Sequence, residues 1–217
     1  MESLSFSISK HFTHPKGGAK HTFMIRAFTI FSKLNFLKLS EMQLYSQAMQ
    51  NFSTKALPCP FCGAKHPSWC SHADYERYLI SFEDGIPVYN LITINRKICS
   101  SCDHTHAILP EILIPHSSYG LLFILRILHD YYGGTHTVAQ LCNKYQVSIS
   151  TLYAWKHLFL LHKKLWLGIL EDMITTINDF LSFIPSLDSS DNLHLFFRSQ
   201  RFSFLEGVSK MARSGYP

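Results

Sequence analysis

The sequence predicts an α+β protein in which a small antiparallel β region precedes a mainly helical region. One observation is a pair of C-x2-C motifs that bracket two stretches rich in Tyr, Ile, Val and Thr, the residue types that favour strands. Another is that apolar residues after residue 116 recur at three- and four-residue spacing, as on one face of a helix. With 217 residues, the chain is long enough for one large or two small domains.

The two cysteine motifs predict a metal site. The first holds Cys59 and Cys62, the second holds Cys99 and Cys102. Gly63 follows the first motif and permits the positive φ that turns backbone amides toward the sulfur atoms. Four thiolates satisfy tetrahedral Zn²⁺, and an ion bound in this way contributes folding free energy to a small lobe. We therefore expect one structural Zn²⁺ held by these four cysteines.

The residues between the motifs form a predicted hairpin, with strands over Tyr75–Phe82 and Val88–Ile98 that are joined at Glu83-Asp84-Gly85. This insert explains why the motifs lie farther apart than the roughly 15 to 20 residues usual in such sites. Segment 58–108 is therefore interpreted as a zinc ribbon. Unligated thiols, or a redox pair of the kind that normally sits on a βα turn, remain as alternatives. We interpret Cys70 as incidental, Cys142 as a small core residue, and His72, His104 and His106 as surface groups or neighbours of the ligands.

Residues 116–184 are interpreted as a helical bundle that continues into a long C-terminal helical region. Ser117-Ser118 is expected to cap a helix over residues 119–132, which Gly133-Gly134 ends. Residues 109–115, bounded by prolines, are expected to be a short linker. Beyond Trp155 the apolar spacing continues, so one long helix or two consecutive helices either pack on the bundle or form a dimer seam.

Two helices separated by a turn are predicted between residues 135 and 159. Ser148 offers a hydroxyl N-cap to the second helix, and the turn needs an uncommon but permitted backbone conformation at Gln146. The pattern predicts a helix-turn-helix, and the alternative is an ordinary helical hairpin in a core. The residues expected to face inward are Val138, Leu141 and Cys142 in the first helix and Leu152, Trp155 and Phe159 in the second.

The side chains left on the outer face of the second helix are suited to DNA. Hydroxyl and aromatic groups can reach base edges or phosphate oxygens from the major groove, while Lys156 and His157 can meet phosphate. Between Asp130 and Glu171 the chain holds lysines and no acid. The candidate DNA-binding residues are Ser148, Ser150, Thr151, Tyr153, Lys156 and His157.

The turn, the Ser-Thr pair after it and the apolar-x-x-Trp that follows resemble the helix-turn-helix of insertion-sequence transposases and their accessory proteins. Between residues 58 and 170, Cys-Pro-x-Cys-Gly, the two-stranded insert and Cys-x-x-Cys-x-His-Thr-His-Ala-x-Leu-Pro resemble a bacterial family of unknown function, often labelled transposase-like. The resemblance implies a zinc-ribbon and helix-turn-helix DNA-binding protein of mobile elements. Its implied partners are double-stranded DNA and either a catalytic transposase subunit or a second copy of itself, with no small-molecule substrate.

Both ends of the chain are expected to lie outside these domains. Residues 1–57 are expected to be a flexible, basic extension that accounts for the whole net charge of +5. Within it, the pattern of Phe23–Leu39 is that of a basic amphipathic helix. This segment either docks on the core, lies upstream of the natural start of the protein, or contacts DNA or a membrane surface. Residues 185–217 are expected to be a short helical tail. With no signal peptide and no uninterrupted apolar span, the protein is expected in the cytoplasm, with the nucleoid, and not in a membrane.

Charge and carboxylates decide between an enzyme and a binding protein. Residues 59–217 carry equal numbers of basic and acidic side chains, so the pI of the whole chain does not argue for nucleic-acid binding. The few acids after Glu171 lie in mainly helical sequence that has no room for a ribonuclease-H-like sheet, and no P-loop or nucleophile elbow is found. We expect a DNA-binding protein without its own catalytic domain, not an enzyme. The rival is a protein-interaction adaptor or transcriptional regulator built from the same modules.

Overall fold

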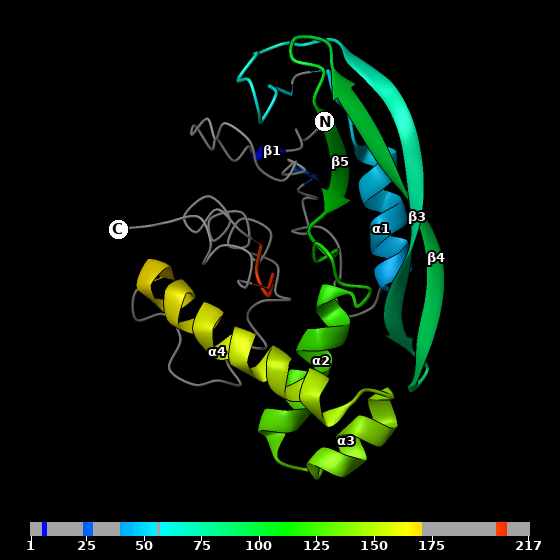
Figure 1. Cartoon of the computed structure of the whole chain (residues 1–217). Helices are drawn as coiled ribbons and strands as arrows, with labels where there is room; N and C mark the ends of the chain where they lie inside the picture. The colour runs from blue at the N-terminus through cyan, green and yellow to red at the C-terminus, as the bar shows by residue number, and fades with distance from the viewer. Residues whose placement is uncertain (1–5, 8–23, 28–39, 56, 171–202, 208–217) are drawn as a thin grey trace.

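The structure, a computed structural model, describes residues 6–7, 24–27, 40–55, 57–170 and 203–207, and Figure 1 draws the others in grey. The described residues form a mixed α+β fold, as predicted, with a sheet in which β3, β4 and β5 are antiparallel. The elements are β1 (Phe6–Ser7), β2 (Met24–Ala27), α1 (Glu41–Asn51), β3 (Trp69–Glu83), β4 (Ile86–Cys99), β5 (Thr105–Pro110), α2 (Leu121–Gly133), α3 (Val138–Tyr145) and α4 (Ile149–Leu170).

The sheet is built around the β3–β4 hairpin, in the strand order β1-β2-β5-β4-β3. Asp84 and Gly85 form its two-residue turn, and both have a positive φ, of 49° and 84°. Turns of this kind match the twist of antiparallel strands, so the Asp-Gly pair specifies the hairpin. The predicted hairpin is confirmed, although each strand is longer than expected.

Residues 24–27 form β2, which pairs in parallel with β5 from Met24 opposite Ala107 to Ala27 opposite Pro110. The expected helix over Phe23–Leu39 is therefore wrong for these four residues. The reason is tertiary, because their backbone groups hydrogen-bond with β5 and this outweighs a local helical pattern. Residues 28–39 lie outside the described part of the chain.

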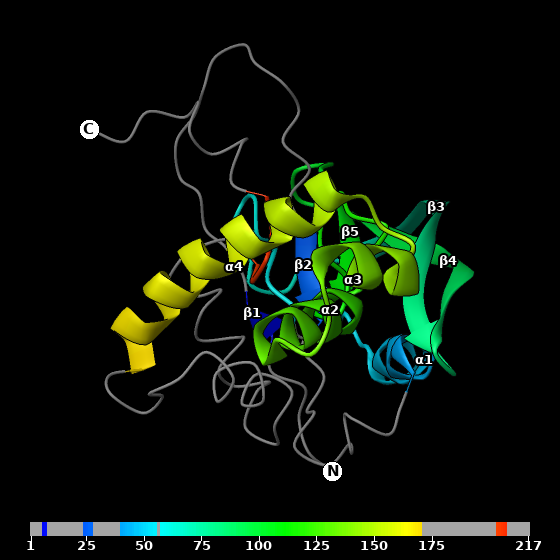
Figure 2. The same ribbon diagram turned by 90° about the horizontal axis from the view of Figure 1, so that it is seen from below.

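Helix α1 covers one face of the hairpin, on the other side of the structure from α4 (Figures 1 and 2). Ser40 and Gln43 form a capping box at its start, so its first backbone N–H groups are satisfied. Leu44 and Tyr45 then pack on Leu79, Ile92 and Ile94 of the sheet. Part of the segment that the sequence places in an N-terminal extension is thus a helix that shares a core with the sheet.

The N-cap of helix α2 is Gly120, and not Ser117-Ser118 as expected. Glycine has no side chain that could accept the first backbone N–H groups of the helix. The cap comes from α1 instead. The carboxylate of Glu41 accepts the backbone N–H groups of Leu122 at 2.8 Å and Phe123 at 3.2 Å. A Cβ on Gly120 would lie 2.0 Å from Glu41 Oε1, so the glycine makes room for the carboxylate. Burial raises the pKa of Glu41 to about 8.

The predicted linker at residues 109–115 is part of the core. Ile112, Leu113 and Ile114 are buried, and Leu113 makes a β-bridge with Gly120. This apolar segment packs between the sheet and α2. It holds the sheet and the helices against each other.

The three helices α2, α3 and α4 enclose the largest apolar cluster, in which Leu141, Tyr145, Leu152, Trp155 and Phe159 are all buried. Phe204 and Leu205, from the short described segment 203–207, join it. Their backbone is tied to α4, because the N–H of Leu205 donates to Nδ1 of His162 at 2.6 Å. Burial lowers the pKa of His162 to about 4. None of the helices in the described part has the length and hydrophobicity that crossing a membrane needs.

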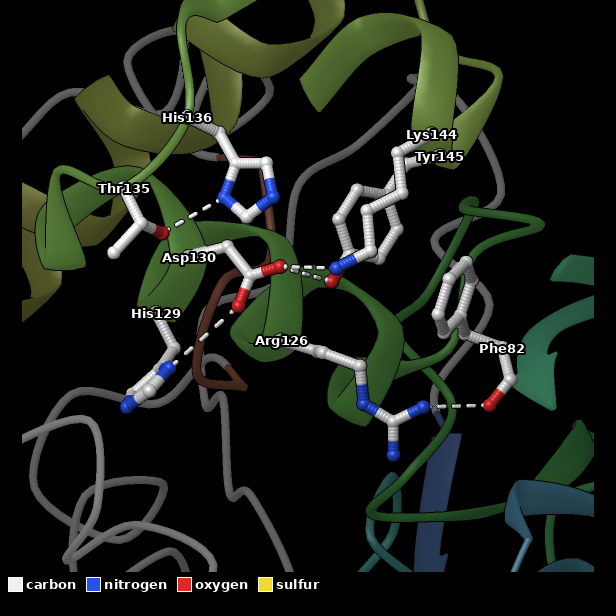
Figure 3. A network of polar contacts seen from close by, with 8 residues as sticks. All are labelled: Phe82, Arg126, His129, Asp130, Thr135, His136, Lys144 and Tyr145. Carbon is white, nitrogen blue, oxygen red and sulfur yellow. Dashed lines mark hydrogen bonds and ion pairs between the residues drawn. The ribbon is translucent and has the colours of Figure 1, made fainter. Parts of the chain in front are cut away.

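The tip of the hairpin meets the helices at Phe82. Its ring lies 4.4 Å from the ring of Tyr145, and its carbonyl accepts a hydrogen bond of 2.6 Å from Arg126. Figure 3 shows that Asp130 continues this joint, because one carboxylate oxygen accepts from both Lys144 and Tyr145. Helices α2 and α3 are thereby fixed against the end of the sheet.

Candidate metal centre and the exposed face of α4

Two short loops, each starting at a cysteine, meet at the end of the hairpin that is far from α2, α3 and α4. In the loop 59–64, the N–H of Cys59 donates to Ala64 O at 2.8 Å, and the N–H of Gly63 donates to Cys59 O at 2.9 Å. The loop 99–104 repeats both bonds, from Cys99 to His104 O at 3.0 Å and from Asp103 to Cys99 O at 2.8 Å. We call these loops the first and the second knuckle.

Both knuckles need a left-handed residue directly after their second cysteine. Gly63 takes this position in the first knuckle with a φ of 74°, as predicted, and Asp103 takes it in the second with a φ of 55°. Glycine adopts this conformation without steric cost, and aspartate is one of the few other residues that tolerate it. The turn directs backbone amides at sulfur, with the N–H of Ala64 on Cys62 and that of His104 on Cys102.

The four sulfur atoms of the knuckles lie within 4.8 Å of one another. Cys59 Sγ is 3.8 Å from Cys102 Sγ, and Cys62 Sγ is 3.9 Å from Cys99 Sγ. A tetrahedral zinc ion with Zn–S bonds of about 2.3 Å places its sulfur ligands roughly 3.8 Å apart. The four cysteines that the sequence singled out are therefore placed to bind a metal ion, and zinc fits their spacing and donor type.

Burial makes the sulfur atoms of Cys59 and Cys102 poor thiolates without a cation. It raises the pKa of the Cys59 thiol far above its ordinary value and that of Cys102 to about 11. For Cys62, the hydrogen bond from the Ala64 amide lowers the pKa of the thiol. A divalent cation at the centre would offset the cost of burying the negative sulfurs, which is why thiolate clusters of this kind hold metal.

The other cysteines and histidines near the motifs take different positions. Cys70 is exposed, and Cys142 is buried in the helical core, as predicted. The ring of His104 is exposed and stacks on Phe61 at a centroid distance of 3.4 Å. His106 is fully buried, with Nε2 3.5 Å from Cys59 Sγ. The sequence had left open whether these histidines are surface groups or neighbours of the ligands. In the structure, His104 lies just before β5 and is a surface group, whereas His106 lies in β5 and neighbours Cys59.

The residues predicted to bind DNA all lie in the first half of α4 or at its cap. Ser148 Oγ accepts the N–H of Thr151 at 3.1 Å, so Ser148 caps the helix as expected. Gln146 has the left-handed backbone that the turn requires, with a φ of 52°. Ser150, Tyr153 and His157 are exposed, while Thr151 and Lys156 are half-buried.

Lys156 is not extended into solvent. Its Nζ donates to the hydroxyl of Tyr131 at 2.8 Å and lies 4.9 Å from the centre of that ring. This hydrogen bond raises the pKa of Lys156, so its charge is retained and held at a defined place between α2 and α4. No sequence pattern pointed to Tyr131, which lies 25 positions away on another helix.

Residues 59–155 match the family model described as "Domain of unknown function (DUF6431)". The searches of the curated proteins and of the solved structures found no match. The matched segment starts at the first metal-site cysteine and ends at Trp155 in the core face of α4, so it spans the metal centre and only the beginning of α4. The chain therefore contains a DUF6431 domain.

Proposed function

We propose that this protein binds double-stranded DNA through the first half of α4, with the four-cysteine centre holding a structural Zn²⁺. The observation that carries this proposal is the contrast between the two faces of α4. Leu152, Trp155 and Phe159 are buried, whereas Ser150, Tyr153 and His157 are exposed. A helix that is anchored on one face and exposes hydroxyl, phenol and imidazole groups on the other is suited to reading the major groove.

The dimensions support this proposal. An α-helix with its side chains is roughly 10 to 12 Å wide, which suits a major groove about 12 Å wide. Helices α3 and α4 follow each other with a turn at residues 146–148, and α2 packs on both, which resembles the three-helix arrangement around a helix-turn-helix. In such an arrangement Ser150 and Tyr153 would face base edges, and His157 would lie nearer the backbone.

The charges on this side of the molecule also support DNA. The sequence has no acid between Asp130 and Glu171, and Asp130 itself is engaged by Lys144 and Tyr145. The phosphates of DNA would therefore meet lysines and no unpaired carboxylate near the start of α4. Lys156, held by Tyr131, would then supply a positioned phosphate contact.

The four-cysteine centre would serve the proposed function indirectly. Strand β4 runs from the hairpin tip to Cys99 over 14 residues, which at about 3.3 Å per residue is roughly 45 Å. Zinc at the far end of this strand would brace the sheet and leave base recognition to the helix. The resemblance to transposase-like proteins extends the proposal to a non-catalytic component of a mobile element, with a catalytic transposase subunit or a second copy as partner.

A second candidate, a protein-interaction adaptor, is favoured by one exposed surface. Tyr78 pairs with Leu91, and Ile80 pairs with Tyr89, so these side chains share a face of the hairpin. Tyr78, Tyr89 and Leu91 are each more than half exposed, at 54%, 58% and 54%. Exposed aromatic and aliphatic groups in a row are typical of protein contacts.

A gel shift with random duplex DNA over a salt series tests the proposal. The zinc-loaded protein is expected to bind, with an affinity that falls steeply as salt increases. Lys156→Ala should weaken binding and flatten the salt dependence, and Ser150→Ala should change sequence preference. Lys65→Ala is the matched control, because it removes one exposed lysine from the loop before β3. Equal effects of the two lysine changes, or no shift by a folded protein at low salt, would favour the adaptor.

A further inference from the structure

His106 is the histidine closest to the candidate metal centre, and its surroundings leave it little freedom. It lies in β5, where its backbone is paired opposite Lys97, and its side chain is 0% exposed. Nε2 is 3.5 Å from Cys59 Sγ, a hydrogen-bond distance for a sulfur acceptor. Its ring meets Trp69 edge-on, with centroids 5.4 Å apart and planes at 84°.

Trp69 extends this contact to the first knuckle. Its indole N–H donates to Leu57 O at 3.1 Å, just before the first cysteine. The ring of His106 is therefore enclosed between the first knuckle, the start of β3 and its own strand. Rotation of the imidazole away from sulfur would require Trp69 or the knuckle to move, so the geometry favours a single orientation.

We propose that His106 is a positioning residue of the metal centre, which donates an Nε2–H···S hydrogen bond to the thiolate of Cys59 and thereby controls how tightly the metal is held. The four cysteines alone complete the tetrahedral shell. His106 acts through one of them and does not bind the metal.

The need for such a donor follows from charge and burial. Four thiolates around one divalent cation leave two net negative charges, and Cys59 is 0% exposed. Cys59 already accepts the backbone N–H groups of Phe61 and Cys62. A side-chain donor on the buried side adds charge stabilisation where water is excluded, and hydrogen bonds to charged groups are the stronger ones.

His104 supplies a matched comparison, two positions earlier in the same strand region. Its Nδ1 lies 3.0 Å from Cys102 O, and its ring stacks on Phe61 in an exposed position. Its side chain thus contacts a knuckle without a hydrogen bond to a ligand sulfur in the described structure. Loss of the His104 ring removes packing at the centre, whereas loss of the His106 ring removes packing and the sulfur contact.

The test uses the full chain loaded with Zn²⁺ or with Co²⁺, and it does not depend on DNA. Zinc affinity is measured by competition with a chromogenic chelator, and the thiolate-to-cobalt charge-transfer band is read by absorption. The variants are His106→Gln, which retains an N–H donor, His106→Met, which does not, and His104→Ala as the control. Their folding with zinc is checked by far-ultraviolet circular dichroism.

His106→Met is expected to weaken zinc binding by about 10- to 100-fold, the usual effect of losing such a partner. It should also move the charge-transfer band to lower energy, because a sulfur that loses a hydrogen bond gives up electron density more easily. His106→Gln should restore most of both properties, and His104→Ala should leave the band unchanged.

Three results would overturn the proposal. One is that the Gln and Met variants behave alike, which would assign His106 to packing alone. Another is that the absorption spectrum of the unaltered, cobalt-loaded protein shows an imidazole nitrogen bound to Co²⁺. If the Met variant does not fold, the Gln variant decides, and a zinc affinity more than about tenfold below that of the unaltered protein would count against the hydrogen bond.

Discussion

The two ends of the β3–β4 hairpin are stabilised in different ways. At the tip, Phe82 enters the large apolar cluster of α2, α3 and α4, where aromatic rings pack on one another. At the cysteine end, the nearest apolar cluster of described residues has only Leu57 and Ile108 fully buried, with Met49, Phe52 and Trp69 partly covered. The end with the thin apolar core is the end that carries the four cysteines.

This difference indicates that apolar packing stabilises one end of the hairpin and metal binding stabilises the other. Apolar burial stabilises by about 25 cal/mol per Å², so a cluster of two buried side chains holds a loop weakly. A structural zinc ion contributes roughly 10 to 16 kcal/mol of binding free energy in small domains. The expected consequence is that the knuckles depend on metal and the helices do not.

The largest expected effect comes from removing one ligand. Cys99→Ser should abolish stoichiometric zinc binding and raise amide hydrogen exchange in residues 57–68 and 99–106, while α2 to α4 keep their protection. The measurement is hydrogen exchange by mass spectrometry together with zinc stoichiometry. Cys70→Ser, at an exposed cysteine outside the cluster, should retain one zinc per chain. Loss of protection in the helices of Cys99→Ser would show that the two ends are one cooperative unit.

The complementary change is at the helical end. Phe159 is fully buried between Tyr132 and Phe204. Phe159→Ala should lower the free energy of unfolding by about 3 to 5 kcal/mol and leave zinc stoichiometry intact. Urea denaturation followed by tryptophan fluorescence measures the former. Tyr78→Ala, at an exposed aromatic, should change stability by less than about 0.5 kcal/mol, and a larger loss there would weaken the comparison.

The next effect depends on pH and concerns Glu41, whose carboxyl joins α1 to α2. Burial raises its pKa from 4.5 to about 8, so the folded state binds its proton more tightly than the unfolded state does. Its contribution to stability is therefore fully present below pH 4.5 and is lost as the pH rises toward 8, by at most about 1.4 kcal/mol per pH unit. Glu41→Gln should flatten this dependence, measured by urea denaturation at several pH values. An unchanged slope would mean that the carboxyl ionises freely in the folded protein.

The smallest expected changes in stability come from exchanging the left-handed residues of the two knuckles. Asp103→Gly relieves a left-handed backbone conformation and should stabilise the zinc-bound protein by up to about 1 kcal/mol. Gly63→Ala introduces the same kind of strain and should destabilise by a similar amount, since open space surrounds the position. Thermal unfolding with excess zinc measures both. If both changes destabilise, the Asp103 side chain has a role that its backbone conformation does not explain.

The sequence predicts what depends on local spacing. Several predicted features follow from residue type and period, and the structure has each of them. They are the four-cysteine cluster, the Asp84-Gly85 turn, the left-handed backbone at Gln146, the Ser148 cap and the inward face of α4. These features need only residues close in sequence or a ligand geometry that tolerates any loop between the motifs.

The features that sequence reasoning missed are contacts between distant segments. Glu41 caps α2 from 81 positions away, β2 pairs with β5, and Tyr131 holds Lys156. No propensity or period encodes such partners, because they arise when elements pack. The expected Ser117-Ser118 cap was wrong for this reason, since Glu41 already satisfies the first N–H groups of α2. The flanking prolines predicted a short linker at residues 109–115 but not the burial of residues 112–114, since that burial comes from contacts with the sheet and α2.

The close contact between the Glu41 carboxyl and Gly120 limits which substitutions these two positions can accept independently. Gly120 lies inside the segment 59–155 that defines the family match, whereas Glu41 lies before it. The two positions are expected to be inherited as a pair, because a side chain at 120 excludes the carboxylate, and a shorter residue at 41 leaves buried amides unbonded. A chimera that receives only residues 59–155 from a relative would bring one half of this pair without the other. Such a chimera is expected to be less stable than either parent unless residue 41 is exchanged as well.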